Sequence, residues 1–143
     1  MDMKFLRRIV QALIGELLGL KRCELGIHFV SEAEITILNG RFLHHAGATD
    51  VITFNYGDKH SKHVRGDVLI CPAIAVKQAK RYRTTWQQEV MRYVVHGLLH
   101  LLAYDDRTPA DRKVMKQTED RILGALKSRF VLDRIASPHE QSL

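Results

Sequence analysis

HGLLHLLAYDD, residues 96–106, carries the clearest chemical signal in this chain. Its two histidines, His96 and His100, are four residues apart, and side chains at that spacing are helix neighbours with Cβ atoms roughly 5–6 Å apart. Two imidazoles placed in this way can share one metal ion. Asp105 and Asp106 follow where the helix is expected to end, and a turn there would bring a carboxylate back as a third ligand. Three protein ligands leave one position of a tetrahedral metal open, which is typical of catalytic sites.

The neighbouring residues favour metal binding over a chance pair of histidines. Gly97 lies between the two histidines, where a small residue allows another element to approach closely. Residues 85–88 (TWQQ) form a capping box that opens the helix. The apolar stripe of this helix consists of Val90, Val94, Gly97, Leu98 and Leu101. The histidines belong to the adjacent stripe, so we expect the site at the border between core and solvent, where a cleft can open.

Capping boxes, turn residues and hydrophobic alternation predict the remaining helices and strands. We expect an amphipathic helix in place of a signal peptide within residues 1–20, because polar residues interrupt its apolar run. Further helices are expected at residues 32–42, 72–83 and 109–127. Strands are expected at residues 24–30, 51–54 and 67–70, the last two antiparallel across a polar loop at 57–63. Together they predict a single α+β domain over residues 1–135, a small mixed sheet packed with about five helices, and a disordered tail at 136–143.

Size, charge and cysteine content narrow the class of protein. The chain has 143 residues, enough for one domain with one core, and no apolar run approaches the roughly 20 residues of a membrane helix. We therefore expect no membrane association. The formal net charge of +6 favours an anionic partner, with nucleic acid as the first candidate, although solubility alone would also account for it. Cys23 and Cys71 are far apart in the sequence, which indicates a reduced, cytoplasmic protein.

Three motifs follow one another along residues 24–125. The last of them, residues 96–105, has the form His-Gly-x-Leu-His-Leu-x-(Gly)-Tyr-Asp, with Ala103 in place of the glycine. The other two are Leu38-Asn39 followed by Thr49-Asp50-Val51-Ile52-Thr53-Phe54, and Gly66-Asp67-Val68. In content and order these motifs resemble the YbeY family, the bacterial metal-dependent endoribonucleases of ribosomal RNA maturation. The C-terminal helix with Met115 and Glu119 is similar as well.

The resemblance implies a metal-dependent endoribonuclease that acts on single-stranded RNA, in particular ribosomal RNA precursor on the small ribosomal subunit, and not on DNA. The third histidine of the family falls on Asp106, so the resemblance implies that His96, His100 and Asp106 hold the metal that activates water. Zn²⁺ is the expected ion, and the carboxylate also makes Mn²⁺ or Fe²⁺ acceptable. The cationic side chains expected to bind phosphates are Arg41, His44, Arg65, Arg92 and Arg107.

The chain departs from the family pattern in further respects. Leu43 stands where the family often has an arginine that serves RNA cleavage. Ala103 replaces glycine at the helix exit, which costs roughly 1 kcal/mol if the residue is left-handed. The family usually has a strand before its first helix, whereas this sequence is expected to start with the helix.

Three other functions compete with RNA cleavage. The same histidine spacing occurs in metzincin proteases, but those place a glutamate after the first histidine as general base, and Gly97 cannot transfer a proton. A non-catalytic RNA-binding ribosome-assembly factor with a metal site remains open, because Leu43 replaces the family's arginine. An iron oxygenase with two histidines and one carboxylate is disfavoured, since its ligands normally come from strands of a β-barrel.

Overall fold

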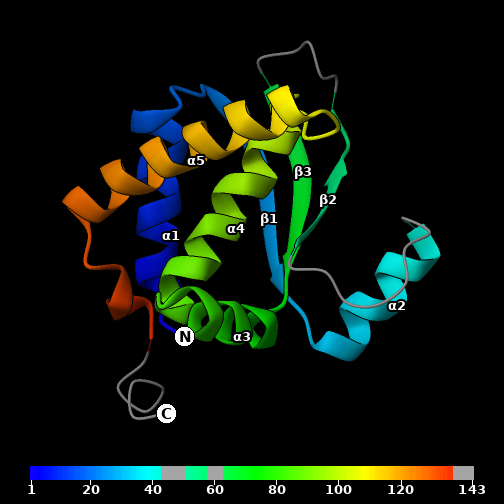
Figure 1. The fold of residues 1–143 in the computed structure, drawn as a ribbon. Helices are drawn as coiled ribbons and strands as arrows, with labels where there is room; N and C mark the ends of the chain where they lie inside the picture. Colours follow the sequence, from blue (N-terminus) through cyan, green and yellow to red (C-terminus); the bar gives the residue numbers. More distant parts are fainter. Residues whose placement is uncertain (43–50, 58–62, 137–143) are drawn as a thin grey trace.

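The computed structural model describes residues 1–42, 51–57 and 63–136. Within these ranges, the helices pack mainly on one side of a three-stranded sheet of order β1-β3-β2 (Figure 1). Strand β1 (Arg22–Phe29) runs parallel, and β2 (Val51–Asn55) antiparallel, to the central β3 (His63–Ile70). The helices are α1 (Met3–Ala12), α2 (Glu32–Phe42), α3 (Pro72–Tyr82), α4 (Trp86–Leu101) and α5 (Pro109–Arg129), with a π turn at Leu13–Leu17 and a 3-10 turn at Leu132–Ile135. The predicted α+β fold with a small mixed sheet is confirmed.

Helix α4 packs directly on the sheet, and Gly97 permits this approach. A Cβ atom at Gly97 would lie 2.7 Å from Cγ1 of Val68 on β3, which is closer than real Cβ contacts. Gly66 plays the matching part on the strand, because a Cβ there would lie 2.7 Å from a methyl group of Leu101. The close approach predicted for Gly97 is therefore present, and it fixes the histidine helix against the central strand.

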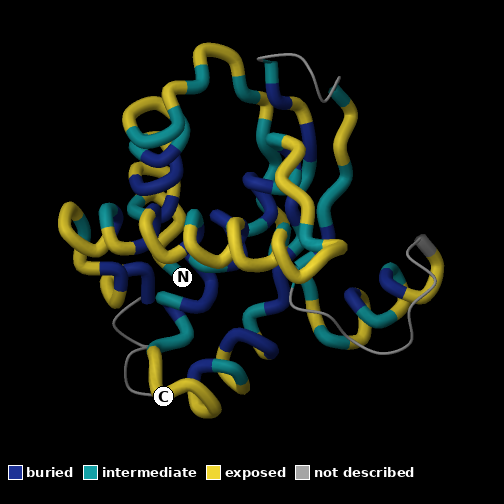
Figure 2. Tube along the Cα trace, turned by 45° about the horizontal axis from the view of Figure 1, so that its top comes forward, coloured by how far each residue is buried: buried dark blue, intermediate teal, exposed yellow. Residues whose placement is uncertain are grey.

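The main core lies between this face of the sheet and the helices. Figure 2 shows buried segments toward the centre of the molecule and exposed residues on the outer turns of the helices. The fully buried large side chains of this core include Ile9, Leu13, Val68, Ile70, Val90, Met91, Leu98, Leu99, Leu126 and Ile135. They come from α1 and the π turn after it, β3, α4, α5 and the C-terminal turn. Helix α4 is therefore enclosed on several sides, which constrains which of its faces points to solvent. None of the described helices combines the length and apolar character needed to cross a membrane.

Helix α2 covers part of the opposite face of the sheet. Ile35 of this helix is fully buried in a second cluster with Ile52 of β2, and Leu69 of β3 packs against them. Val68 contacts α4 while its neighbour Leu69 packs in this second cluster, as expected from the alternation of side chains along a strand. The remainder of this face carries polar groups, among them Arg65, which pairs with Glu24 at 3.0 Å.

Several element boundaries differ from the sequence prediction. Strand β3 begins at His63, four residues before the expected start at Asp67, because its first half pairs with β1 from Arg22 onward. His63 therefore belongs to the strand and not to the predicted loop, whose residues 58–62 lie outside the described ranges. Ala136, assigned to the tail by the sequence, is buried at 4% exposure, and residues 137–143 of that tail are not described.

Candidate metal centre and cleft

Helix α4 presents His96 and His100 at the edge of the core. Thr85 caps the helix by accepting a hydrogen bond from the Gln88 amide at 3.2 Å, as the capping box predicts. The side chains of His96 and His100 are 25% and 26% exposed, so both lie between core and solvent. Their Nε2 atoms are 2.9 Å apart and point toward one another.

A tight turn returns the chain from the end of α4 toward these histidines. Ala103 has a φ of 71°, in the left-handed region. The Tyr104 amide donates to the Leu99 carbonyl at 3.0 Å, and the Ala103 amide donates to the His100 carbonyl at 3.0 Å. These two hydrogen bonds form a Schellman motif, in which the left-handed residue is usually glycine. The turn brings Asp106 back toward the histidines, as the sequence predicts for a third ligand.

Asp106, and not Asp105, faces the histidines. Its Oδ2 lies 3.4 Å from Nε2 of His100 and 3.9 Å from Nε2 of His96. Asp105 instead accepts the Asp106 amide at 2.8 Å and lies 3.6 Å from the Nε of Arg107. The structure thus separates the two carboxylates that the sequence could not fully distinguish.

The three side chains can hold one metal ion. One donor atom from each of His96, His100 and Asp106 lies within 4.8 Å of the others. Bonds of about 2.0–2.2 Å to a tetrahedral zinc would place ligand atoms roughly 3.3–3.5 Å apart, and the measured separations lie on both sides of that value. Two imidazole nitrogens and one carboxylate oxygen are a ligand set that suits zinc and also manganese or iron.

Glu119 of α5 orients His96 from behind. It is 7% exposed, and one of its carboxylate oxygens hydrogen-bonds Nδ1 of His96. A carboxylate on one ring nitrogen holds the proton there, which leaves the lone pair of Nε2 free for a metal. The sequence comparison with the family includes Glu119 in the similar C-terminal helix but assigns it no function. The available signal was an acidic residue among the apolar positions Met115, Ile122 and Leu123 of its helix, all of which are buried.

Burial lowers the pKa of His100 below its ordinary value of 6.5, and the adjacent His96 lowers it further. Desolvation penalises the charged imidazolium, so His100 is favoured in the neutral form. Only the neutral form offers an Nε2 lone pair, so this environment prepares His100 to bind a metal at neutral pH.

Comparison with known proteins agrees with the family that the motifs indicate. A family model described as Endoribonuclease YbeY matches residues 2–127. The chain belongs to the YbeY family. Relatives named Endoribonuclease YbeY include those of Elusimicrobium minutum, 37% identical over 117 residues (80% of this chain and 81% of the relative), and of Parabacteroides distasonis, 31% identical over 113 residues (79% and 78%).

A solved structure shares the fold of this chain. The chain is similar to the solution structure of TM1509 from Thermotoga maritima, with a TM-score of 0.67 and 24% identity, covering 95% of this chain and 89% of that one. At this identity the likeness speaks for the fold. The family resemblance predicted from the three motifs is confirmed.

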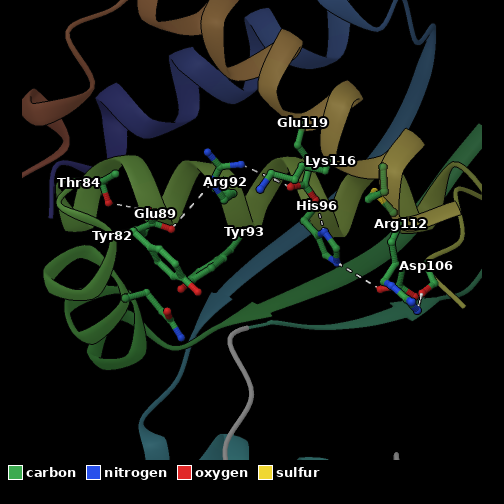
Figure 3. A pocket seen from close by; sticks show the side chains of 12 residues that line it. Tyr82, Thr84, Glu89, Arg92, Tyr93, His96, Asp106, Arg112, Lys116 and Glu119 are labelled. Atoms are coloured by element: carbon green, nitrogen blue, oxygen red, sulfur yellow. Dashed lines mark hydrogen bonds and ion pairs between the residues drawn. The ribbon is translucent and has the colours of Figure 1, made fainter. Parts of the chain in front are cut away.

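A cleft opens beside His96, His100 and Asp106, the candidate metal-binding group of this YbeY chain. Its volume is about 550 Å³, and it runs between α3, α4 and α5 (Figure 3). His96 and Asp106 lie toward one end, and Tyr82 and Thr84 toward the other. The remaining lining residues are Gln78, Glu89, Arg92, Tyr93, Arg112, Met115, Lys116 and Glu119.

Two of the predicted phosphate-binding residues lie near the metal-binding group. Arg92 lines the cleft, and its Nη1 lies 3.0 Å from Asp120 and 3.6 Å from Glu119, so carboxylates balance much of its charge. Arg107 lines a smaller cavity of about 240 Å³ with His100 and Asp106, and its side chain is 84% exposed.

The other predicted phosphate-binding residues are not brought to this site. Arg65 alternates with Val64 and Gly66 along β3, and it therefore points to the sheet face opposite α4. Arg41 is exposed at the end of α2, the helix that covers that opposite face. His44 and Leu43 lie outside the described residues.

Proposed function

We propose that this chain is a metal-dependent endoribonuclease specific for single strands, which uses His96, His100 and Asp106 to hold Zn²⁺. The observation that carries the proposal is the convergence of these three donors within 4.8 Å at one end of a 550 Å³ cleft, in a chain of the YbeY family. A bound zinc ion would acidify a water molecule and neutralise charge on the phosphate being cleaved. Mn²⁺ or Fe²⁺ would fit the same donors.

The residues around the donors supply position and charge. Glu119 fixes the His96 ring, and Arg92 holds Glu119 from the other side at 3.6 Å. Arg107 is exposed beside Asp106, and we expect it to contact a phosphate that flanks the scissile bond. A cleft of this volume admits a few nucleotides, which favours a single strand over a duplex.

The biological setting follows from the family and from composition. The formal net charge of +6 favours a polyanionic partner, and we propose ribosomal RNA precursor on the small ribosomal subunit as that partner. A cytoplasmic location is consistent with the two free cysteines, Cys23 and Cys71.

Peptide hydrolysis is disfavoured by the packing of Gly97. The general-base glutamate of a metalloprotease would occupy this position, yet even a Cβ here would meet Val68 at 2.7 Å. A side chain at position 97 would require Val68 or α4 to shift.

The decisive test is cleavage of a single-stranded ribosomal RNA fragment by zinc-loaded protein and by Asp106→Ala. Asp105→Ala is the matched control, because the Asp105 side chain has a similar exposure, 46% against 44%, and is not one of the three converging donors. We expect cleavage by the wild type and by Asp105→Ala, and none by Asp106→Ala. RNA binding without cleavage by any of them would favour the assembly-factor function. Equal cleavage by all three would refute this active site.

A further inference from the structure

The cleft continues well beyond the residues that the proposed metal chemistry uses. Glu89 lies seven residues before His96 on α4, which corresponds to about 10 Å along the helix at 1.5 Å per residue. Thr84 donates a hydrogen bond to Glu89 at 2.6 Å and closes this far end. A stacked strand advances about 3.4 Å per nucleotide, so the cleft spans about two to three nucleotides from the metal-binding group.

Tyr82 presents an aromatic ring at the far end of the cleft. It is the last residue of α3, and it is 60% exposed although it is a large aromatic residue. The guanidinium of Arg81 lies 5.4 Å from the ring centroid, so one contact steadies the ring while most of its surface remains in solvent. Figure 3 shows the Tyr82 side chain directed into the cleft beside Tyr93. A ring held in this way is a stacking platform of the kind that single-stranded nucleic acids use.

Gln78 adds a polar group to the same end. It precedes Tyr82 by four residues on α3, so the two side chains project from one face of the helix. Its Oε1 atom is buried and accepts no hydrogen bond from the described part of the chain. Buried carbonyl oxygens are nearly always satisfied in native proteins, so this one calls for a donor that enters the cleft. The N–H groups at the edge of a nucleobase are such donors.

The opposite wall of the cleft is cationic. Arg112 and Lys116 are four residues apart on α5, and both line the cleft, Arg112 beside Asp106 and Lys116 nearer to Tyr82 (Figure 3). The Nη1 of Arg112 donates to the backbone carbonyls of Asp106 and Arg107 at 3.3 Å each, which positions its guanidinium beside the metal-binding turn. An aromatic and amide wall facing a cationic wall matches a strand with its bases on one side and its phosphates on the other.

We propose that Gln78 and Tyr82 form a nucleobase subsite, which holds one base of the RNA about two to three nucleotides from the scissile phosphate. The Tyr82 ring stacks on the base, the Gln78 amide hydrogen-bonds its edge, Lys116 contacts an intervening phosphate, and Arg112 contacts a phosphate beside the metal-binding turn. This inference rests on the proposed function, because it defines the substrate strand in terms of the same cleft.

The test uses zinc-loaded protein and a set of short fluorescent single-stranded RNAs, each with one abasic nucleotide at a different distance from the mapped cut. We expect one abasic position to lower kcat/KM by about five- to a hundredfold, the range that the loss of one stacked base gives. Tyr82→Ala is expected to lower kcat/KM to a similar extent on intact RNA and to have little further effect on the RNA that lacks that base. Gln78→Leu should show the same coupling to a smaller degree.

Two variants control for the ring and for the loss of an exposed tyrosine. Tyr82→Phe keeps the stacking surface and should retain kcat/KM. Tyr56→Ala removes a tyrosine of equal exposure, 60%, from a strand end outside this cleft and should have no position-dependent effect. Zinc content and thermal unfolding of Tyr82→Ala verify that its metal site and fold are intact.

The outcomes separate the subsite from the proposed function. Cleavage that no abasic position alters, or losses from Tyr82→Ala that are the same on intact and abasic RNA, would overturn the subsite and leave the endoribonuclease standing. Failure of the wild type to cleave any RNA of the set would overturn the proposed function. In that case fluorescence anisotropy with the same RNAs and variants decides the subsite, since uncleaved RNA reports binding directly, and the same coupling is expected in Kd.

Discussion

Substitution of Ala103 by glycine should stabilise the protein. Ala103 is exposed and has a φ of 71°, so the change removes conformational strain without uncovering apolar surface. The left-handed conformation costs an L-residue roughly 1–2 kcal/mol, and the extra freedom of glycine in the unfolded chain takes back about 0.4–1 kcal/mol. The expected net gain in the free energy of unfolding is about 0.5–1 kcal/mol. At about 2–4 °C for each kcal/mol in a chain of this size, Tm should rise by about 1–4 °C.

The assay is urea unfolding and calorimetry of the metal-free protein, with EDTA present so that changes in metal affinity do not contribute. Ala125→Gly is the matched control, because Ala125 lies inside α5, where the same substitution should destabilise by about 0.5–1 kcal/mol. Opposite signs for the two substitutions would support the reasoning. A loss of stability in Ala103→Gly would refute it, because the turn would then not carry the strain that its φ indicates.

Four further predictions concern the metal site. His96→Ala or His100→Ala should abolish bound metal on elemental analysis, and full metal content in either would disprove the assignment. Asp106→His should keep the metal. Loss of the metal from this variant would show that the turn after α4 positions a carboxylate, but not the longer imidazole, within reach of the ion. Glu119→Gln should weaken metal affinity about 10–100-fold in a chelator competition, since it loosens His96; unchanged affinity would argue against orientation. With its pKa lowered, His100 binds a proton more readily in the unfolded chain, so the stability of the metal-free protein should fall below pH 6.5, and less so in His100→Asn.

Local features of the fold were predictable because their causes are local. The caps at Ser31, Thr85 and Thr108 accept amide hydrogen bonds from residues three positions on, as the capping patterns indicate. The left-handed turn at Ala103 follows from the family's glycine at that position. The i, i+4 geometry of His96 and His100 needs only the helix itself.

The remaining features depend on contacts between distant segments. The hydrogen bond of Glu119 to His96 joins residues 23 positions apart, and only the packing of α5 on α4 brings it about. The far end of the cleft depends likewise on where α3 ends relative to α4. Arg65 was expected near the site, but its alternation with Val64 along β3 places it on the other face, which a longer predicted strand would have revealed.

The three proposed metal donors lie within eleven residues of sequence, from His96 to Asp106. The chain segment that an ion must close is therefore short, and its closure entropy is small. Contacts of such low sequence separation can form in microseconds, before long-range strand pairing such as that between β1 and β3. The proposed site can thus close before the sheet is complete, and an ion bound there during synthesis would hold the end of α4 while the sheet is still assembling.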